Sequence, residues 1–471
     1  MKTLMRRSLV LVLVCSLSGC AIVSPQLTPQ VDIAATWNES TSAGAVGVSP
    51  TWWTAFDSPE LESLVTEALA GGPDLAIATE RVQQAEAQVR VASASLFPVL
   101  SAESSTAGHR TSSVGGAKTG GAVVDSAGSV GLTASYELDL WGKNRAGVRS
   151  AEASAAAAGF DLDTAQVTLV SGVATSYFDV LALRTRLGIA RDNLATAQKI
   201  LDLVSARARN GAASALDVSQ QQAAVLSQQA GLLPLEQQER QTLAALAVLL
   251  GRAPEGFDVK AQGIEDLRVP AIDPGLPSTL LVRRPDLASA EAQLAAANAD
   301  VSAARAALLP SITLTGTAGL ATTALTSIAT GGTTAATGIA ASMLQPIFDG
   351  GRLRGQKAVA ESRERELVET YRKAILSAFA DVEQALAATS HLGQEGQLQT
   401  DVQAQAQESL RLAEIRYKAG AEDLLTVLDA QRTLFAAQDE LAQVALSRLQ
   451  AAVSLYKALG GGWSDAAAPS A

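Results

Sequence analysis

The residue types that usually perform enzymatic chemistry are scarce in this chain of 471 residues. Its two histidines are His109, in a Gly/Ser-rich stretch, and His391, in the segment SHLGQEG. Neither has the carboxylate or cysteine spacing of a metal site or a catalytic triad. The Gly-rich segment SVGGAKTGG lacks the strand-to-helix context that a phosphate-binding loop requires. We therefore predict no catalytic residue, no metal centre and no cofactor, and hence a protein that is not an enzyme.

Cys20 is the residue whose surroundings predict a covalent modification. It follows a positively charged start, MKTLMRR, and an apolar run too short to span a bilayer, which together indicate a signal peptide over 1–19. The ending Leu-Ser-Gly-Cys resembles a bacterial lipobox, in which the cysteine receives diacylglycerol and an N-acyl chain and becomes the mature N-terminus. Ala21 resembles the residue that directs lipoproteins to the outer membrane. The alternative is an ordinary signal peptide that contains a cysteine by chance.

The composition narrows the class of protein further. Hydrophobic residues make up 48% of the chain but aromatic residues only 4%, which favours closely packed helices over a broad globular core. The formal net charge is −11, whereas a nucleic-acid-binding protein needs a basic surface. Nucleic acid is therefore not an expected partner.

The chain contains an internal duplication. The segments GGPDLAIATERVQQAEAQVRVASASLFPVL at 71–100 and RRPDLASAEAQLAAANADVSAARAALLPSI at 283–312 share the triplet PDL and a Leu-x-Pro ending. Further along, RARNGAASALDV at 207–218 matches RYKAGAEDLLTV at 416–427. Self-similarity of this kind predicts two structurally equivalent halves.

Each half is expected to contain one helix, two strands and one long helical hairpin. The expected parts are a lipidated extension at 20–58, a first repeat at 59–255, a linker at 256–284, a second repeat at 285–459 and a flexible tail at 460–471. The strands are expected at about 99–108, 129–141, 311–320 and 335–348. The hairpins are expected at 142–252 and 351–459.

The long helices have an unusual predicted length. Neither 142–209 nor 351–418 contains a proline, so at ~1.5 Å per residue each would extend roughly 100 Å. Gly211 and Gly420 mark the turns of the two hairpins. Pro234 is expected to kink the first return helix.

The predicted strands alternate between apolar and polar side chains. In SVGLTASYELDLW at 129–141, residues Thr133–Asp139 place their polar side chains on one face, and SITLTGTAGL repeats the pattern. A half-buried strand of a soluble sheet alternates in this way, and so does a strand of an outer-membrane barrel. Four strands cannot close a barrel, which needs ~8, and open edges are forbidden in lipid, so a barrel would require several chains. Trp141 is either a membrane-interface anchor or a packing residue at the base of the strands.

Taken together, these segments resemble the TolC-like outer-membrane efflux factor family, and in particular its lipoprotein branch. The resemblance runs from Trp52 to Leu459, and its most specific phrases are LLVRRPDLASAEAQLAAANADVSAARAALLPSITL, ASYELDLWGKNR, QPIFDGGRLRGQ and RYKAGAEDLLTVLDAQRTLFAAQDEL. It implies a mixed α+β membrane protein that forms a homotrimer. Four strands per chain would build a 12-stranded β-barrel, which a long α-helical periplasmic tunnel would continue.

The resemblance also implies a function and partners. The trimer would be a passive exit duct for drugs or other small molecules, anchored by lipid in the bacterial outer membrane. A periplasmic adaptor and an inner-membrane pump, most similar to the RND type, would deliver the cargo. The alternatives are the outer-membrane duct of a type I protein secretion system and a structural coiled-coil lipoprotein of the periplasm.

The same resemblance implies a gate at the periplasmic hairpin turns. Asp429, in LTVLDAQR, would form a ring of three carboxylates that attracts cations, and the second aspartate of the family is replaced here by Thr426. Leu425 would form an apolar constriction, and Arg432 would lie beside the ring.

A hydrogen-bonded pair in the family, which holds the two hairpins together, matches Asp217 and Tyr417. The arginine that reinforces this pair corresponds to Glu422 here, which puts the charged part of the link in doubt. Four residues at the turns match positions of possible adaptor contact, although capping or hairpin packing explains them equally well. They are Arg207, Gly211, Arg416 and Gly420.

Overall fold

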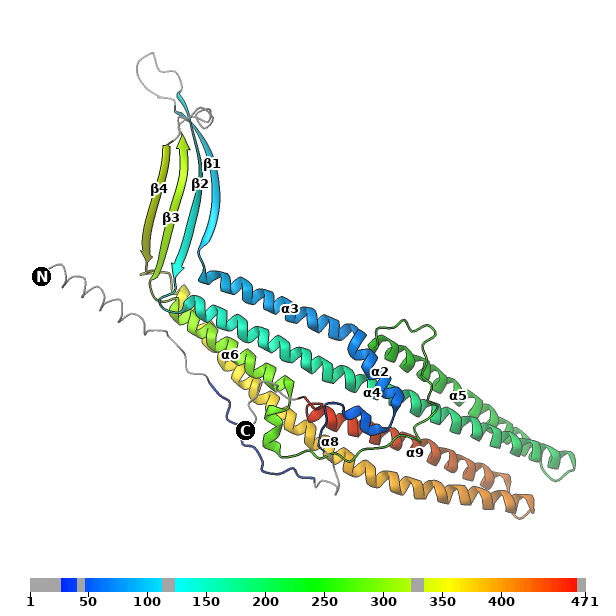
Figure 1. Cartoon of the computed structure of the whole chain (residues 1–471). Helices are drawn as coiled ribbons and strands as arrows, with labels where there is room; N and C mark the ends of the chain where they lie inside the picture. Colours follow the sequence, from blue (N-terminus) through cyan, green and yellow to red (C-terminus); the bar gives the residue numbers. More distant parts are fainter. Residues whose placement is uncertain (1–26, 40–46, 112–122, 323–333, 464–471) are drawn as a thin grey trace. The chain divides into compact units, whose positions relative to one another are not determined.

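The computed structural model describes residues 27–39, 47–111, 123–322 and 334–463 (Figure 1). The predicted signal peptide and Cys20 lie outside these residues. The chain forms two compact units. The first contains Gln83–Ala157 and Ala290–Tyr371, and the second contains Gln30–Val82, Ala158–Ser289 and the chain from Arg372 onward.

The first unit contains a four-stranded antiparallel sheet with the order β1-β2-β3-β4 (Figure 1). Its strands are β1 (Val99–Thr111), β2 (Val123–Leu138), β3 (Ser311–Thr322) and β4 (Thr334–Leu344). The central pair, β2 and β3, joins the two repeats, so the duplicated halves share one sheet. β2 begins earlier than predicted. β4 ends at Leu344 instead of residue 348, since Pro346 has no N–H to donate to a strand ladder.

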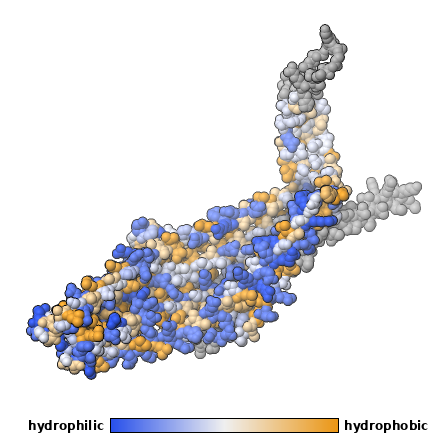
Figure 2. Space-filling view, turned by 180° about the vertical axis from the view of Figure 1, so that it is seen from behind, coloured by the Kyte–Doolittle hydropathy of each residue, from blue (hydrophilic) through white to orange (hydrophobic). Residues whose placement is uncertain are grey.

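The strand register gives the sheet one apolar and one polar face. Leu132 pairs with Ala318, and the next residue, Thr133, pairs with Thr317 on the opposite face. The apolar face carries Leu100, Val130, Leu132, Leu314, Leu320 and Ile339, and the polar face carries Ser101, Glu103, Thr133, Thr315, Thr317 and Ser342. The apolar side chains are exposed in the single chain: Leu132 is 51% exposed and Ile339 is 93% exposed. Figure 2 shows that the strand surface in view is mostly pale or orange, with little strongly hydrophilic colour.

An aspartate just before each long helix caps the first turn of that helix. Asp139 accepts hydrogen bonds from the backbone N–H groups of Asn144 (3.1 Å) and Arg145 (2.9 Å). Asp349 accepts equivalent bonds, both 3.0 Å, from the N–H groups of Gly351 and Leu353. Such bonds satisfy the free N–H groups of a first helical turn. Because Asp139 is engaged in this way, β2 ends at Leu138 and not at the predicted residue 141.

The helices repeat their lengths in the two halves. The hairpin helices are α4 (Lys143–Arg209) and α5 (Ala215–Leu249) in the first repeat, and α8 (Arg352–Lys418) and α9 (Leu424–Ala458) in the second. The long members have 67 residues each and the return members 35 each. α5 continues as one helix through Pro234. The remaining helices are η1 (Trp52–Phe56), α2 (Pro59–Gly71), α3 (Pro73–Ser93), η2 (Ala94–Leu96), η3 (Pro277–Val282) and α6 (Pro285–Ala306).

An aromatic cluster forms part of the core of the second unit. The rings of Trp52 and Tyr456 stack with centroids 4.9 Å apart, and Phe56 lies 4.9 Å from Phe178. Trp52 and Phe56 are almost completely buried. The short helix η1 therefore fixes the N-terminal region against α4 and the end of α9.

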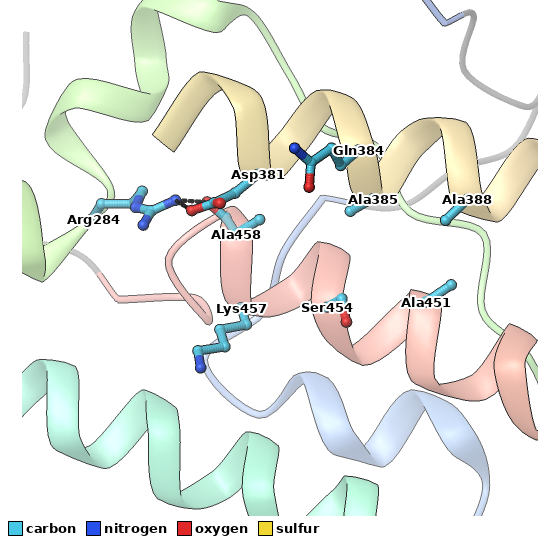
Figure 3. A pocket seen from close by; sticks show the side chains of 9 residues that line it. All are labelled: Arg284, Asp381, Gln384, Ala385, Ala388, Ala451, Ser454, Lys457 and Ala458. Carbon is cyan, nitrogen blue, oxygen red and sulfur yellow. Dashed lines mark hydrogen bonds and ion pairs between the residues drawn. The ribbon is translucent and has the colours of Figure 1, made fainter. Parts of the chain in front are cut away.

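Arg284, from the RRPDL phrase, connects three elements of the second unit (Figure 3). Its guanidinium pairs with Asp286 (2.7 Å) at the start of α6 and with Asp381 (3.1 Å) of α8, and it donates to the carbonyl of Ala458 (3.2 Å) in α9. The side chain is only 12% exposed. A pocket of about 430 Å³ lies beside it, between small side chains of α8 and α9. The phrase is thus a structural connector in this chain.

Candidate functional site at the hairpin turns

The two hairpin turns have the same backbone construction. In the first, the N–H of Ala212 donates to the carbonyl of Arg207 (2.8 Å), and Gly211 has φ of 73°. In the second, the N–H of Ala421 donates to the carbonyl of Arg416 (2.9 Å), and the adjacent Gly420 has φ of 74°. This is the Schellman ending of a helix, in which glycine takes the left-handed conformation. Gly211 and Gly420 therefore have a conformational role that is independent of any adaptor.

Each return helix begins with a local side-chain cap. The hydroxyl of Ser214 accepts from the N–H of Asp217 (3.1 Å), and the Asp217 carboxylate accepts from the N–H of Ser214 (2.7 Å). At the second turn, Asp423 accepts from the N–H of Thr426 (2.9 Å). These contacts form a reciprocal capping box at α5 and a simple cap at α9.

An apolar cluster packs the two hairpins together just behind the turns. It combines side chains of α4, α8 and α9, and most of them are more than nine-tenths buried. The buried members are Ile200, Val204, Ala406, Leu410, Ala413, Tyr417, Leu424, Val427, Ala430, Leu434 and Ala437. The tips of the two hairpins of one chain are therefore in contact through their side chains.

The predicted hydrogen bond between Asp217 and Tyr417 is absent from the structure. Asp217 is engaged in its own capping box, and the Tyr417 hydroxyl is buried without a hydrogen-bond partner among the described residues. Burial raises the pKa of Tyr417; the positive charge of Arg207 opposes this shift and the negative charge of Asp217 adds to it. The two residues are thus close enough to interact electrostatically, but they form no hydrogen-bonded link within the chain.

A different residue makes the contact with Tyr417. The guanidinium carbon of Arg207 lies 4.4 Å from the centroid of the Tyr417 ring, and the same guanidinium donates to the Tyr417 carbonyl. Arg416, at the equivalent position of the second repeat, instead pairs with Glu422 in its own turn (3.1 Å). Glu422 therefore forms an ion pair inside the second turn, whereas the family arginine at this position was expected to reinforce the link between hairpins.

Leu425, Asp429 and Arg432 form one exposed stripe of α9. They are spaced by four and three residues, which places them on the same side of a helix. Leu425 is 59% exposed, and the paired side chains of Asp429 and Arg432 are 75% and 73% exposed, with 3.4 Å between their nearest charged atoms. The described part of one chain contains no group of three or more residues suited to hold a metal ion. A ring of Asp429 carboxylates would require three chains.

Sequence reasoning did not identify two glutamines that are buried near the turns. Gln221 is completely buried and donates to the carbonyl of Ala197 (2.8 Å), which links α5 to α4. Gln431 is 3% exposed and faces away from the Asp429 stripe. Both lie at positions where the helical period predicts an apolar side chain. A glutamine at such a position is the sequence feature that could have identified them as buried polar residues.

Comparison with protein families places the chain beside known membrane proteins. A model described as outer membrane efflux protein matches residues 64–252 and again 276–461. The pyoverdine export outer membrane protein OpmQ of Pseudomonas aeruginosa is 47% identical over 419 residues, which cover 88% of each chain. OpmQ of Pseudomonas putida is 42% identical over 98% of each chain. The toluene efflux pump outer membrane protein TtgC of Pseudomonas putida is 34% identical over 95% of this chain and 94% of its own.

Solved structures show the same fold. The outer-membrane channel OprN superposes with a TM-score of 0.85 at 28% identity, covering 94% of this chain and 100% of that chain. The open state of the Neisseria gonorrhoeae MtrE outer membrane channel superposes with a TM-score of 0.82 at 30% identity, covering 94% of this chain and 98% of that chain.

Proposed function

The chain belongs to the outer membrane efflux protein family, and on this premise we propose that its cargo is a small molecule of the pyoverdine type. Relatives at 47% and 42% identity are named for pyoverdine export, whereas relatives named for toluene and antibiotic efflux are 34% identical. This difference in identity, over nearly the full length of the chain, carries the proposal. Efflux of drugs is the second candidate, and secretion of protein is the third.

The fold provides the channel. Members of the structural group are trimeric channels of the TolC family, and the mixed α+β fold predicted from the sequence is confirmed. With four strands per chain, β1 of one subunit would pair with β4 of the next, which leaves no open edge in the bilayer. The apolar face of the sheet suits lipid, and its row of Thr and Ser side chains suits a water-filled lumen. Such a duct conducts without performing chemistry on its cargo.

A lipid anchor would hold the protein in the outer membrane in addition to the barrel. Its support is the sequence Leu-Ser-Gly-Cys at Cys20 after a charged and apolar leader. Metabolic labelling with an alkyne palmitate should mark the wild-type protein and leave Cys20→Ala unmarked. Equal labelling of both proteins would contradict a lipid anchor at Cys20.

The partners would be a periplasmic adaptor and an inner-membrane pump. The family works in tripartite systems of this kind, and the RND type of pump remains a prediction. The exposed turn residues Gly211 and Gly420 are the proposed adaptor contacts. Purification of the cross-linked assembly and mass spectrometry would identify the pump, and recovery of an ATP-driven exporter would overturn the RND assignment.

The gate would be the ring of hairpin turns, with Leu425 and Asp429 lining its narrowest part. The support is that both side chains are exposed on one side of α9, while the opposite side packs into the apolar cluster of the tips. A passive duct needs such a closure, because an open tunnel would abolish the barrier function of the outer membrane.

Complementation tests the proposed cargo. A Pseudomonas aeruginosa strain that lacks OpmQ should retain pyoverdine in the periplasm, and production of this chain should return its fluorescence to the medium. Immunoblotting for the heat-labile trimer in the outer membrane provides the control for assembly. An assembled trimer that lowers toluene or antibiotic susceptibility but leaves pyoverdine in the periplasm would overturn the pyoverdine proposal and favour drug efflux.

A further inference from the structure

We propose that Arg207 is an intrachain clamp that holds the two hairpin tips together and thereby favours the closed gate. The proposal rests on the proposed gating function of the turns. It assigns the link between the hairpins to Arg207 and the ring of Tyr417, in place of the hydrogen bond between Asp217 and the Tyr417 hydroxyl.

The guanidinium of Arg207 makes two kinds of contact with Tyr417. Its carbon lies 4.4 Å from the ring centroid, which is the geometry of a cation–π interaction. One of its terminal nitrogens donates to the Tyr417 carbonyl oxygen. Arginine suits both contacts at once, because its planar group stacks on a ring and also presents several N–H donors.

The Tyr417 carbonyl occupies a special position in α8. It accepts the N–H of Gly420 (3.0 Å) as part of the Schellman ending, at the C-terminal end of the helix. The last carbonyls of a helix carry partial negative charge, so a cation placed there is stabilised. Arg207, which belongs to α4, therefore completes the end of a helix in the other hairpin. Separation of the tips would break both of its contacts with Tyr417.

The Tyr417 hydroxyl makes no contribution to this clamp. It is buried and has no hydrogen-bond partner among the described residues, and the residue as a whole is 5% exposed. Only the ring face and the main-chain carbonyl take part. Phenylalanine at this position would therefore preserve the clamp, whereas an aliphatic side chain would remove its cation–π contact.

Comparison of the two repeats shows that only one of the two equivalent arginines forms the clamp. Arg416 is the repeat equivalent of Arg207, yet it pairs with Glu422 in its own turn. The position equivalent to Tyr417 in the first repeat is Ala208, which offers no ring. Each chain thus has one clamp, and a trimer would have three. Arg416 provides a matched control, because it has the same residue type, repeat position and net charge change.

The first experiment measures single-channel currents of purified full-length trimers in planar bilayers. Arg207→Ala and Tyr417→Leu should each raise the ratio of open to closed time about tenfold, and the double variant should show less than the product of the two effects. Arg207→Lys, which keeps the charge but lacks the planar group, should fall between wild type and Arg207→Ala. Tyr417→Phe and Arg416→Ala should stay within about twofold of wild type.

The outcomes separate the clamp from the proposed function. Assembled trimers that never conduct, in wild type or variants, would contradict the exit duct itself. Conducting trimers in which Arg207→Ala behaves as wild type would overturn the clamp alone. A Tyr417→Phe variant that opens as readily as Arg207→Ala would also overturn it, and would restore the hydroxyl as the linking group.

A distance measurement tests the clamp without relying on conductance. Spin labels at the exposed positions Asn210 and Ala419 report the separation of the two turns within a chain. Trimers that contain one labelled subunit should give a narrow distance distribution in wild type, Tyr417→Phe and Arg416→Ala. Arg207→Ala should broaden the distribution toward longer distances. An unchanged distribution in Arg207→Ala would show that the apolar cluster alone holds the tips together.

Discussion

The indole Nε1 of Trp141 donates a 2.7 Å hydrogen bond to the carbonyl oxygen of Pro310. Trp141 follows β2 of the first repeat, and Pro310 immediately precedes β3 of the second. The bond therefore fastens the two repeats at the base of the shared sheet, beside the central strand pair. A tryptophan that serves only as a membrane-interface anchor would point its N–H toward the headgroups. The contact identifies Trp141 as a packing residue that joins the repeats.

Replacement of Trp141 by phenylalanine tests this link. The ring is largely retained, but the Pro310 carbonyl loses its donor, so we expect a loss of about 1 kcal/mol of stability. The temperature at which the trimer dissociates on semi-native gels should fall. Trp53→Phe is the control, because the Trp53 indole has no hydrogen bond among the described residues. An equal effect of the two substitutions would argue that only ring size matters.

Arg284 should be far more important for stability than its neighbour Arg283. Its side chain is 12% exposed, forms ion pairs with Asp286 and Asp381, and donates a hydrogen bond to the carbonyl of Ala458. Arg284→Ala therefore leaves these acceptors without their donor. We expect a cost of about 2–3 kcal/mol, reduced from the value for a fully buried pair because both carboxylates are partly exposed. Arg283 is exposed and forms no ion pair in the described chain, which makes Arg283→Ala the matched control.

Denaturant unfolding of the solubilised trimers would measure the difference between these two variants. Arg284→Lys should recover only part of the loss, because an ammonium lacks the fork that pairs with Asp286. Equal midpoints for the Arg284→Ala and Arg283→Ala proteins would show that the RRPDL phrase has no connecting role.

Periodicity in the sequence was sufficient to predict the strands and the duplication. The alternation of Leu132 and Thr133 specified the two faces of the sheet, and the match between 207–218 and 416–427 specified two equivalent turns. The strand ends were less predictable. The side chain of Asp139 caps the next helix. Capping competes with strand pairing at this residue, and β2 is therefore shorter than predicted.

The predicted hydrogen bond between Asp217 and Tyr417 is not formed within the described chain. Ser214 and Asp217 are spaced as a capping box, so the sequence contained the signal that Asp217 has a local partner. The position of Arg207 over Tyr417 could not be predicted from spacing. It depends on α4 and α8 lying side by side, and these residues are separated by 210 positions in the chain.

Tyr177 predicts a pH dependence of stability in the alkaline range. Burial raises its pKa from 10.0 to about 12, and its hydroxyl lies 3.1 Å from the Ser58 hydroxyl and donates to Glu60 (3.2 Å). The folded state therefore holds this proton more tightly than the unfolded state. The stability that results is complete below pH 10 and is lost as the pH rises toward 12, by roughly 2 kcal/mol.

Comparison of wild type with Tyr177→Phe isolates this contribution. Phenylalanine has no proton to lose, so the variant should be less stable at pH 8 but should lose less stability between pH 10 and 12. The measurement is the denaturant midpoint across that range. Parallel pH profiles for the two proteins would show that Tyr177 does not titrate in this way.

Asp429 and its neighbour Arg432 should affect cation block of the channel in opposite directions. Three Asp429 carboxylates near the axis would attract multivalent cations, and Arg432 lies 3.4 Å from Asp429 and partly offsets its charge. Asp429→Ala should weaken block by Mg²⁺ at least tenfold, and Arg432→Gln should strengthen it by a smaller factor.

Glu408 and Arg411 form a similar exposed i,i+3 pair on α8, so Glu408→Gln is the matched control. Bilayer recordings with Mg²⁺ on the periplasmic side would measure these effects, and an equal weakening of block by Asp429→Ala and Glu408→Gln would indicate general surface charge. Because Asp429 and Glu408 lose the same charge on different helices, block that responds to Asp429 and not to Glu408 also tests which side of α9 lines the gate.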